Sequence, residues 1–297
     1  RKMNPVPDRR LAPLMAVAET GSMTAAANRL YVTQPAVSQQ LASLGKDLGL
    51  PLLTHRGTRV ELTPVARELV AYARRLTLDN RAVLAHLQTG QTPPLRLGVT
   101  VSLGNFLLPR LLADPTIAAR ALEVTIANTA TLAAQLRAGK LTAALVEGNF
   151  PAADFASLDL GLADFIGVAA QPLPALTLPE LFSHYLLVRE PGSGTREILT
   201  NWLAAHNAGL ADFSRTLALN SPAAIINLLK EGVGISFMYR ALVEEELTTG
   251  DLHPLPLAGF PLRHPLSLIY LRGSSFADEL VPLAEVARRV LKELATK

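Results

Sequence analysis

The sequence contains no cysteine among its 297 residues. This absence excludes disulfide bonds, thiol-based sensing and cysteine-ligated metals. The six histidines include no pair at metal-ligand spacing. No apolar run approaches the ~18 residues of a membrane-spanning helix, and the charged start RKMNPVPDRR has no apolar core behind it, as a secretory signal would require. We therefore expect a soluble, cytoplasmic protein that binds no metal or cofactor and does not act at a membrane.

Two common enzyme signatures are also missing. Gly192-Ser193-Gly194 lacks the flanking residues of a nucleophile elbow. The segment GVGISF, which starts at Gly232, lacks the third glycine of a dinucleotide-binding fingerprint. We predict that the protein is not an enzyme. A small-anion enzyme and a solute-binding protein are the alternatives; turnover of an anion would favour the first, and failure to bind duplex DNA the second.

The sequence does have length, apolar content and an uneven distribution of charge. Hydrophobic residues make up 49% of the chain, enough for two or three compact units. Residues 1–90 contain 12 Lys and Arg against 6 Asp and Glu, whereas residues 91–297 contain 16 against 19. The positive end is therefore the end that can bind a phosphate backbone.

Residues 20–62 have the pattern of a helix-turn-helix followed by a basic hairpin. Ser22 can cap a first helix, and Thr33 a second one that has Pro35 in its first turn. Apolar residues at spacings of four, three and four predict one buried stripe on the second helix, formed by Val37, Leu41, Leu44 and Leu48. Short uncharged side chains suited to base edges in the major groove occupy the opposite face: Gln34, Ser38, Gln39 and Ala42. An ordinary amphipathic helix of a bundle is the alternative.

The hairpin is predicted to join Leu52–Thr54 to Val60–Leu62. Its tip is Arg56-Gly57-Thr58-Arg59, where Gly57 permits the turn. Arg56 and Arg59 flank the tip, so both can reach phosphate oxygens.

A long helix is predicted next, from the cap Thr63 through Pro64 to about Gln88. Its length is roughly 37 Å at 1.5 Å per residue. Its apolar positions follow a heptad-like spacing: Val65, Leu69, Tyr72, Leu76 and Val83. Because nothing adjacent in sequence covers this stripe, we predict a dimerisation helix. Packing of the helix against the rest of its own chain is the alternative.

Residues 91–94 are predicted to form a hinge or linker. After them short apolar strands alternate with helices, which predicts a parallel α/β sheet. Ligands of such sheets bind beyond the carboxyl ends of the strands. The residues at these places have small hydroxyl or amide side chains: Thr100, Ser102, Asn128, Thr129, Ser193, Thr195, Asn220 and Ser221. Arg196 is the only charged residue beside them. Free N–H groups at helix starts would favour a small anion there. For each hydroxyl taken alone, a simple helix cap is the alternative.

The string AVAETGSMTAAANRLYVTQPAVSQQLASL resembles the LysR-type transcriptional regulators, and the resemblance extends over the whole chain. It implies an N-terminal winged helix-turn-helix with a long linker helix, then a two-lobed α/β effector domain like a periplasmic binding protein. The implied boundaries are 1–63 for the DNA-binding domain, 64–90 for the linker or dimerisation helix and 91–297 for the effector domain. Lobe I would comprise about 95–162 and 266–297, and lobe II about 163–265.

The resemblance also implies which residues face DNA. These are Thr24, Thr33, Gln34, Pro35, Ser38, Gln39, Arg56 and Arg59. Gly45 replaces a usual glutamate and is predicted to interrupt the recognition helix near its end, at roughly 1 kcal/mol against a good helix former. The expected partners are a double-stranded dyad operator, further copies of the chain in a homodimer or homotetramer, and RNA polymerase as a further candidate.

The strings VREPGSGTR and GNFLLP resemble the branch of the family that controls sulfur assimilation or carbon fixation, whose effectors are small anions. A sulfur oxyanion is our first expectation, a phosphorylated metabolite the second and a carboxylate the third. The predicted effector-binding residues are Thr100, Ser102, Asn128, Thr129, Glu147, Ser193, Thr195, Arg196 and Ser221. Pro222 stands where the branch usually has threonine, which removes one hydroxyl ligand.

Overall fold

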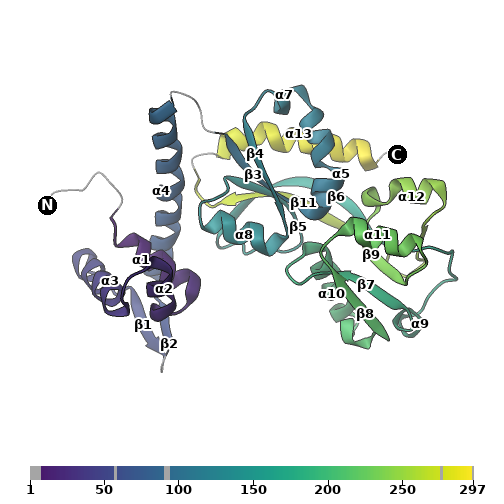
Figure 1. Cartoon of the computed structure of the whole chain (residues 1–297), viewed down its shortest axis with the longest axis horizontal. Coiled ribbons are helices and arrows are strands. Elements are labelled where there is room, and N and C mark those ends of the chain that lie inside the picture. The colour runs from purple at the N-terminus through teal and green to yellow at the C-terminus, as the bar shows by residue number, and fades with distance from the viewer. Residues whose placement is uncertain (1–7, 57–58, 90–93, 275–276, 296–297) are drawn as a thin grey trace. The chain divides into compact units, whose positions relative to one another are not determined.

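The computed structural model describes residues 8–56, 59–89, 94–274 and 277–295. The chain divides into two compact units, Arg1–Pro93 and Pro94–Lys297 (Figure 1). The long helix that the sequence sets apart as a linker is grouped with the first unit. Each unit is described by itself below.

The first unit is a winged helix-turn-helix followed by a long helix. Its elements in chain order are α1 Leu11–Thr20, α2 Met23–Leu30, α3 Gln34–Leu48, the antiparallel strands β1 Leu53–Arg56 and β2 Arg59–Leu62, and α4 Pro64–Thr89. The core is formed by fully buried side chains from α1, α2 and α3, such as Leu14, Ala26 and Val37. The predicted order of helix, turn, helix, hairpin and long helix agrees with these elements.

Local interactions agree with the predicted helix starts at two of three positions. The Ala25 N–H donates to Ser22 Oγ at 3.3 Å, and the Ala66 N–H donates to Thr63 Oγ1 at 3.1 Å. Thr33 is the N-cap residue of α3, as predicted, but its side chain makes no capping hydrogen bond to the described residues. Thr33 precedes α3 in an extended conformation, and Pro35 lies in the first turn.

The end of α3 differs from the predicted pattern. Leu48 is 46% exposed, so the buried stripe ends at Leu44, because the helix stops at Leu48 and Gly49 adopts a left-handed conformation. Gly45 does not interrupt the helix. A Cβ at Gly45 would lie 2.9 Å from the Leu50 carbonyl oxygen, so glycine allows the chain after the helix to fold back closely.

The second unit contains one mixed nine-stranded sheet. Its order is β4-β3-β5-β11-β6-β9-β7-β8, with β10 paired to β6. The strand bounds are β3 Leu95–Thr100, β4 Leu122–Ala127, β5 Ala143–Glu147, β6 Phe155–Ala169, β7 Tyr185–Arg189, β8 Arg215–Leu219, β9 Ile235–Tyr239, β10 His253–Pro254 and β11 Leu262–Leu271.

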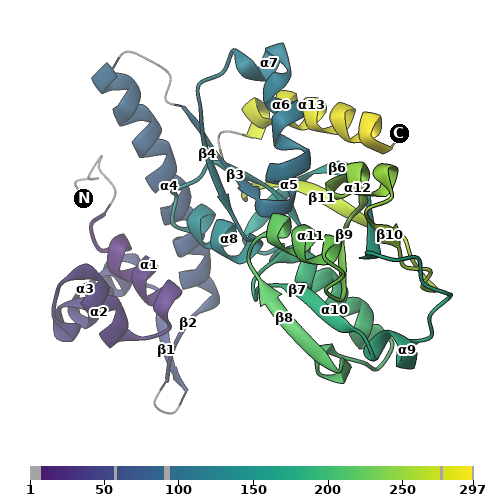
Figure 2. The ribbon, with the colours of Figure 1, turned by 45° about the vertical axis from the view of Figure 1, so that its right-hand side comes forward.

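Helices cover this sheet (Figure 2). Their bounds are α5 Val101–Phe106, α6 Leu108–Ala113, α7 Pro115–Ala118, α8 Thr129–Arg137, α9 Leu178–Phe182, α10 Gly194–Ala205, α11 Pro222–Lys230, α12 Glu244–Thr249 and α13 Ala277–Ala295, with 3-10 turns at Leu210–Asp212 and Arg240–Leu242. Helices α5 and α6 are separate, since the prolyl nitrogen of Pro109 cannot continue the hydrogen bonding of α5.

Two long antiparallel strands join the lobes. Strand β11 pairs with β5 of the first lobe, and β6 pairs with β9 of the second. The two strands also pair with each other over most of their length, from Phe155↔Leu271 to Phe165↔Leu262. The sequence analysis did not predict β6 as a strand. The chain therefore crosses between the lobes twice, as the family resemblance implies, and it crosses as continuous sheet.

No helix in the described part of the chain is both long enough and apolar enough to cross a membrane.

Candidate effector site

The carboxyl ends of three strands carry buried polar side chains that the fold brings close together. Thr100 ends β3, Glu147 ends β5 and Arg189 ends β7, and each is at least 95% buried. Strands β3 and β5 are parallel neighbours, so Thr100 and Glu147 meet at the same edge of the sheet. This edge is where ligands of α/β sheets bind.

Glu147 lies at the centre of this group and is 2% exposed. Thr100 Oγ1 donates a short hydrogen bond to its carboxylate, and Thr129 Oγ1 donates to its main-chain oxygen at 3.2 Å. Burial raises the pKa of Glu147 to about 7, while the bond from Thr100 and the positive charge of Arg189 act to lower it. Near neutral pH this carboxyl therefore exists in both protonation states.

Ser102, in the first turn of α5, has a side chain without a partner. It is 1% exposed, and its Oγ makes no hydrogen bond to any described residue. It is close enough to Glu147 to lower the pKa of that carboxyl slightly, although it does not reach bonding geometry. An unsatisfied buried hydroxyl costs about 1–3 kcal/mol. A bound group at this position would satisfy it.

The start of α10 closes the site from the second lobe. Ser193 Oγ and Thr195 Oγ1 are buried and 2.8 Å apart, and neither caps the helix. Gly194 lies directly against Glu147, since a Cβ on it would stand 2.4 Å from the Glu147 carbonyl oxygen. Only glycine allows this approach between the two lobes.

Arg189 is a functional candidate that the sequence analysis missed. Its guanidinium pairs with Glu190 through hydrogen bonds of 2.9 and 3.1 Å, and Arg196 Nη1 donates to its carbonyl oxygen at 2.9 Å. Asn128 Nδ2 donates to the same Glu190 across the lobes at 3.3 Å. The available signal was the position of Arg189 as the last residue of the strand YLLVR, three residues before Gly192.

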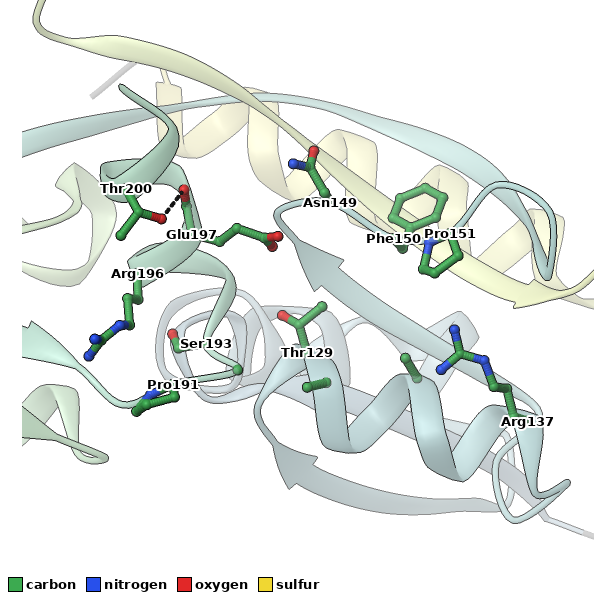
Figure 3. Close-up of a pocket in the computed structure, with 13 residues that line it drawn as sticks. Thr129, Arg137, Asn149, Phe150, Pro151, Pro191, Ser193, Arg196, Glu197 and Thr200 are labelled. Atoms are coloured by element: carbon green, nitrogen blue, oxygen red, sulfur yellow. Dashed lines mark hydrogen bonds between the residues drawn. The ribbon is translucent and has the colours of Figure 1, made fainter. Parts of the chain in front are cut away.

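An open cavity of about 450 Å³ adjoins the buried group (Figure 3). Side chains from α8, residues 149–151 and the start of α10 line it, among them Thr129, Arg137, Ser193, Arg196 and Glu197. Three of the predicted effector residues therefore reach this cavity: Thr129, Ser193 and Arg196. Thr100, Ser102, Glu147 and Thr195 belong to the buried group.

Two predicted effector residues act as helix caps. Asn128 Oδ1 accepts a hydrogen bond from the Thr131 N–H at 3.0 Å, and Ser221 Oγ accepts one from the Ala224 N–H at 3.2 Å. Asn128 still reaches the second lobe through Glu190. The observed hydrogen bond of Ser221 is that of a helix cap, and a role of Ser221 in effector binding stays a prediction.

The predicted DNA-facing residues lie mainly on the surface of α3. Thr33, Gln34, Pro35 and Gln39 are exposed, as is Thr24 on α2, and Ser38 is half-buried. Gln34 and Ser38 also line a groove between α3 and the hairpin. The side chains of Arg56 and Arg59 lie outside the described residues, as do Gly57 and Thr58 at the tip; the backbones of the two arginines pair across the hairpin.

The predicted dimerisation stripe of α4 is partly used within its own unit. Val65 and Tyr72 are exposed, Tyr72 by 49%, whereas Leu69 and Leu76 pack partly against the helix-turn-helix core. The side chain of Val83 lies outside the described residues. Leu84 and Leu87 are also exposed, and the sequence analysis did not select them.

Two family models match the chain. "Bacterial regulatory helix-turn-helix protein, lysR family" covers residues 9–67, and "LysR substrate binding domain" covers residues 88–293. The chain belongs to the LysR family of transcription regulators. This LysR-type regulator therefore joins a DNA-binding domain to an effector-binding domain, and it is not an enzyme. The predicted family and fold are confirmed.

Similar proteins place this LysR-type regulator near those of carbon fixation. The RuBisCO operon transcriptional regulator of Allochromatium vinosum is 29% identical over 97% of this chain and 96% of its own length. The transcriptional activator CmpR of a Synechocystis strain is 28% identical over 91% and 95%. The predicted branch is thus confirmed on its carbon-fixation side.

Solved structures show the same fold. ArgP from Mycobacterium tuberculosis superposes with a TM-score of 0.63 at 21% identity, covering 96% of this chain and 97% of its own. The regulatory domain of Synechocystis CcmR in complex with 2-PG superposes with a TM-score of 0.58 at 22% identity, covering 67% and 97%.

Proposed function

We propose that the effector domain binds a small anion at the group formed by Thr100, Ser102, Glu147 and the start of α10, and that binding alters operator binding or promoter activation. The observation that carries this proposal is the buried Ser102 hydroxyl without a partner, at the edge of the sheet where ligands bind. Because the surrounding residues come from both lobes, a ligand there could stabilise one arrangement of the lobes over another.

Charge and hydrogen-bonding capacity support an anion. Arg189 and Arg196 flank the site, and the N-terminus of the 12-residue helix α10 points into it. The side-chain hydroxyls of Ser193 and Thr195 do not cap α10, so they can donate hydrogen bonds to a ligand. While the Glu147 carboxylate is ionised, its negative charge disfavours the binding of a highly charged anion.

The relatives suggest which anion to test first. One relative is named as a regulator of the RuBisCO operon, and the CcmR domain was solved with 2-PG. We therefore place a phosphorylated acid ahead of the sulfur oxyanion that the sequence analysis placed first. Both remain small, oxygen-rich anions that the same donors would recognise.

We also propose that α4 contributes to a homodimer or homotetramer on a dyad operator, with RNA polymerase as a further contact. The exposed apolar side chains of Val65, Tyr72, Leu84 and Leu87 support this role. The basic N-terminal unit supports operator binding through phosphate contacts.

A thermal-shift and calorimetry panel on the full chain tests the anion site. The panel contains 2-PG, phosphate, sulfite, sulfate and small carboxylates. An anion at 100 times its dissociation constant should stabilise the effector unit by ~2.7 kcal/mol. The substitutions Ser102→Ala and Thr100→Val together should abolish this stabilisation, because they remove two hydroxyls of the site.

The control variant is Thr131→Val, which changes an exposed threonine on α8. It should keep the full response to the anion. If no anion stabilises the chain, or if the double variant responds like the wild type, the assigned site is wrong.

A further inference from the structure

We propose that the effector site binds its anion together with one proton, carried by the Glu147 carboxyl, so that affinity falls as the pH rises. This inference rests on the proposed anion site and specifies its regulation. It concerns one carboxyl at the floor of the site, enclosed by β3, α5 and the start of α10.

The hydrogen-bonding capacity of the Glu147 carboxyl depends on its protonation state. An ionised carboxylate only accepts hydrogen bonds, and so do the oxygens of a small anion; placed side by side they repel each other. The protonated carboxyl has one O–H to donate. With Thr100 Oγ1 already donating to one carboxyl oxygen, the other can carry the proton and present it to the ligand beside the unpartnered Ser102 hydroxyl.

The charges around Glu147 also affect its protonation state. Arg189 on β7 is the nearest positive charge, but Glu190 already pairs with its guanidinium through two hydrogen bonds. Glu197 on α10 lies beside Gly148 and adds negative charge, while Arg196 on the same helix adds positive charge. The remaining groups are the buried Tyr239 on β9, whose pKa is raised by burial and by Glu147, and His264 on β11, 3.5 Å from the Tyr239 hydroxyl.

These groups leave no excess positive charge to hold both a carboxylate and an anion. Entry of an anion therefore favours the protonated form of Glu147 and raises the pKa of that carboxyl above its value without ligand. The proton comes from solvent and stays on a Glu147 carboxyl oxygen while the ligand is bound.

The sign and range of the effect follow from linkage. Burial places the pKa of Glu147 at about 7 in the free protein. Well below this pH the carboxyl is protonated before and after binding, so affinity does not change with pH. Above it each binding event takes up a proton, and affinity should fall by up to about tenfold per pH unit.

Isothermal titration calorimetry on the full chain tests the inference. Sulfate, which does not titrate in the working range, and 2-PG are titrated at several values from about pH 6 to about pH 8.5. Each titration is repeated in buffers of different ionisation enthalpy, and the change in the observed binding enthalpy gives the number of protons taken up. Wild type should approach one proton per site at the upper pH, after correction for protons on 2-PG itself. Glu147→Gln should take up none and lose the pH dependence of affinity, because its amide is always neutral and can donate.

Glu285→Gln is the matched control, since it makes the same substitution at an exposed carboxyl on α13 that neither belongs to the buried group nor lines the cavity. It should keep the proton uptake and the slope of wild type. Binding without proton uptake, or an unchanged slope in Glu147→Gln, would overturn the linkage while leaving the anion site in place. Failure of every anion to bind at any pH would instead reject the site itself, and with it both proposals.

Discussion

Replacing Glu147 by glutamine is expected to remove a pH dependence of about 3 kcal/mol from the free energy of unfolding of the effector unit. The pKa of this carboxyl is raised from 4.5 to about 7 by burial. The folded protein therefore holds a proton that the unfolded chain releases. The associated stability is fully present below about pH 4.5 and is lost as the pH rises to about 7. The glutamine variant has no proton to lose at this position, so its stability relative to wild type should increase over the same range.

Denaturant titrations at intervals from about pH 5 to about pH 8 measure this difference. Trp202, the only tryptophan of the chain, lies in α10 and makes fluorescence report on the effector unit. Glu285→Gln again serves as the control and should follow the wild-type curve. If wild type and Glu147→Gln kept a constant difference across this range, the carboxyl would not be protonated near neutral pH.

Replacing Gln34 or Ser38 by alanine is expected to relax base discrimination by ~1–3 kcal/mol for each lost contact, and the double variant by about twice that. Both residues lie on the outer side of α3, and both line the groove between α3 and the hairpin. Their side chains can donate and accept hydrogen bonds, as base edges in the major groove require.

Fluorescence anisotropy with an operator selected from a random duplex library, and with single-base variants of it, checks this prediction. Gln40→Ala is the control, because Gln40 is the same residue type on the same helix but away from the groove-facing positions. It should retain affinity and discrimination. Equal discrimination by the Gln34 and Ser38 variants would mean that another face of α3 reads the operator.

The first unit could be predicted from sequence because its signals are local. The cap at Ser22, the cap at Thr63 and the stripe from Val37 to Leu44 each depend on residues within one or two helical turns. The errors arose where tertiary contacts decide the outcome. Gly45 looked like a helix breaker, but the approach of the Leu50 carbonyl requires it.

The effector site could be predicted only in part. The strand-end rule selected Thr100 and Ser102, and the family resemblance added Glu147; the fold brings these three residues together. Neither the rule nor the resemblance indicated that Ser102 would lack a partner or that Glu147 would be fully enclosed, because both depend on how the second lobe packs through Gly194. Strand β6 was missed for a related reason. Its burial varies irregularly from Phe155 to Asp164, whereas Phe165–Ala169 are all buried, so no single periodicity describes it.

Anion binding in the effector unit is expected to control the DNA-binding unit. A footprint and a binding isotherm of the full chain on its selected operator, with and without a saturating anion, test this claim most directly. We expect the anion to change the operator affinity or the footprint of wild type. Thr100→Val with Ser102→Ala should remove this change while operator binding without anion is retained. Identical footprints and affinities in wild type, at an anion concentration shown to stabilise the protein, would contradict this expectation.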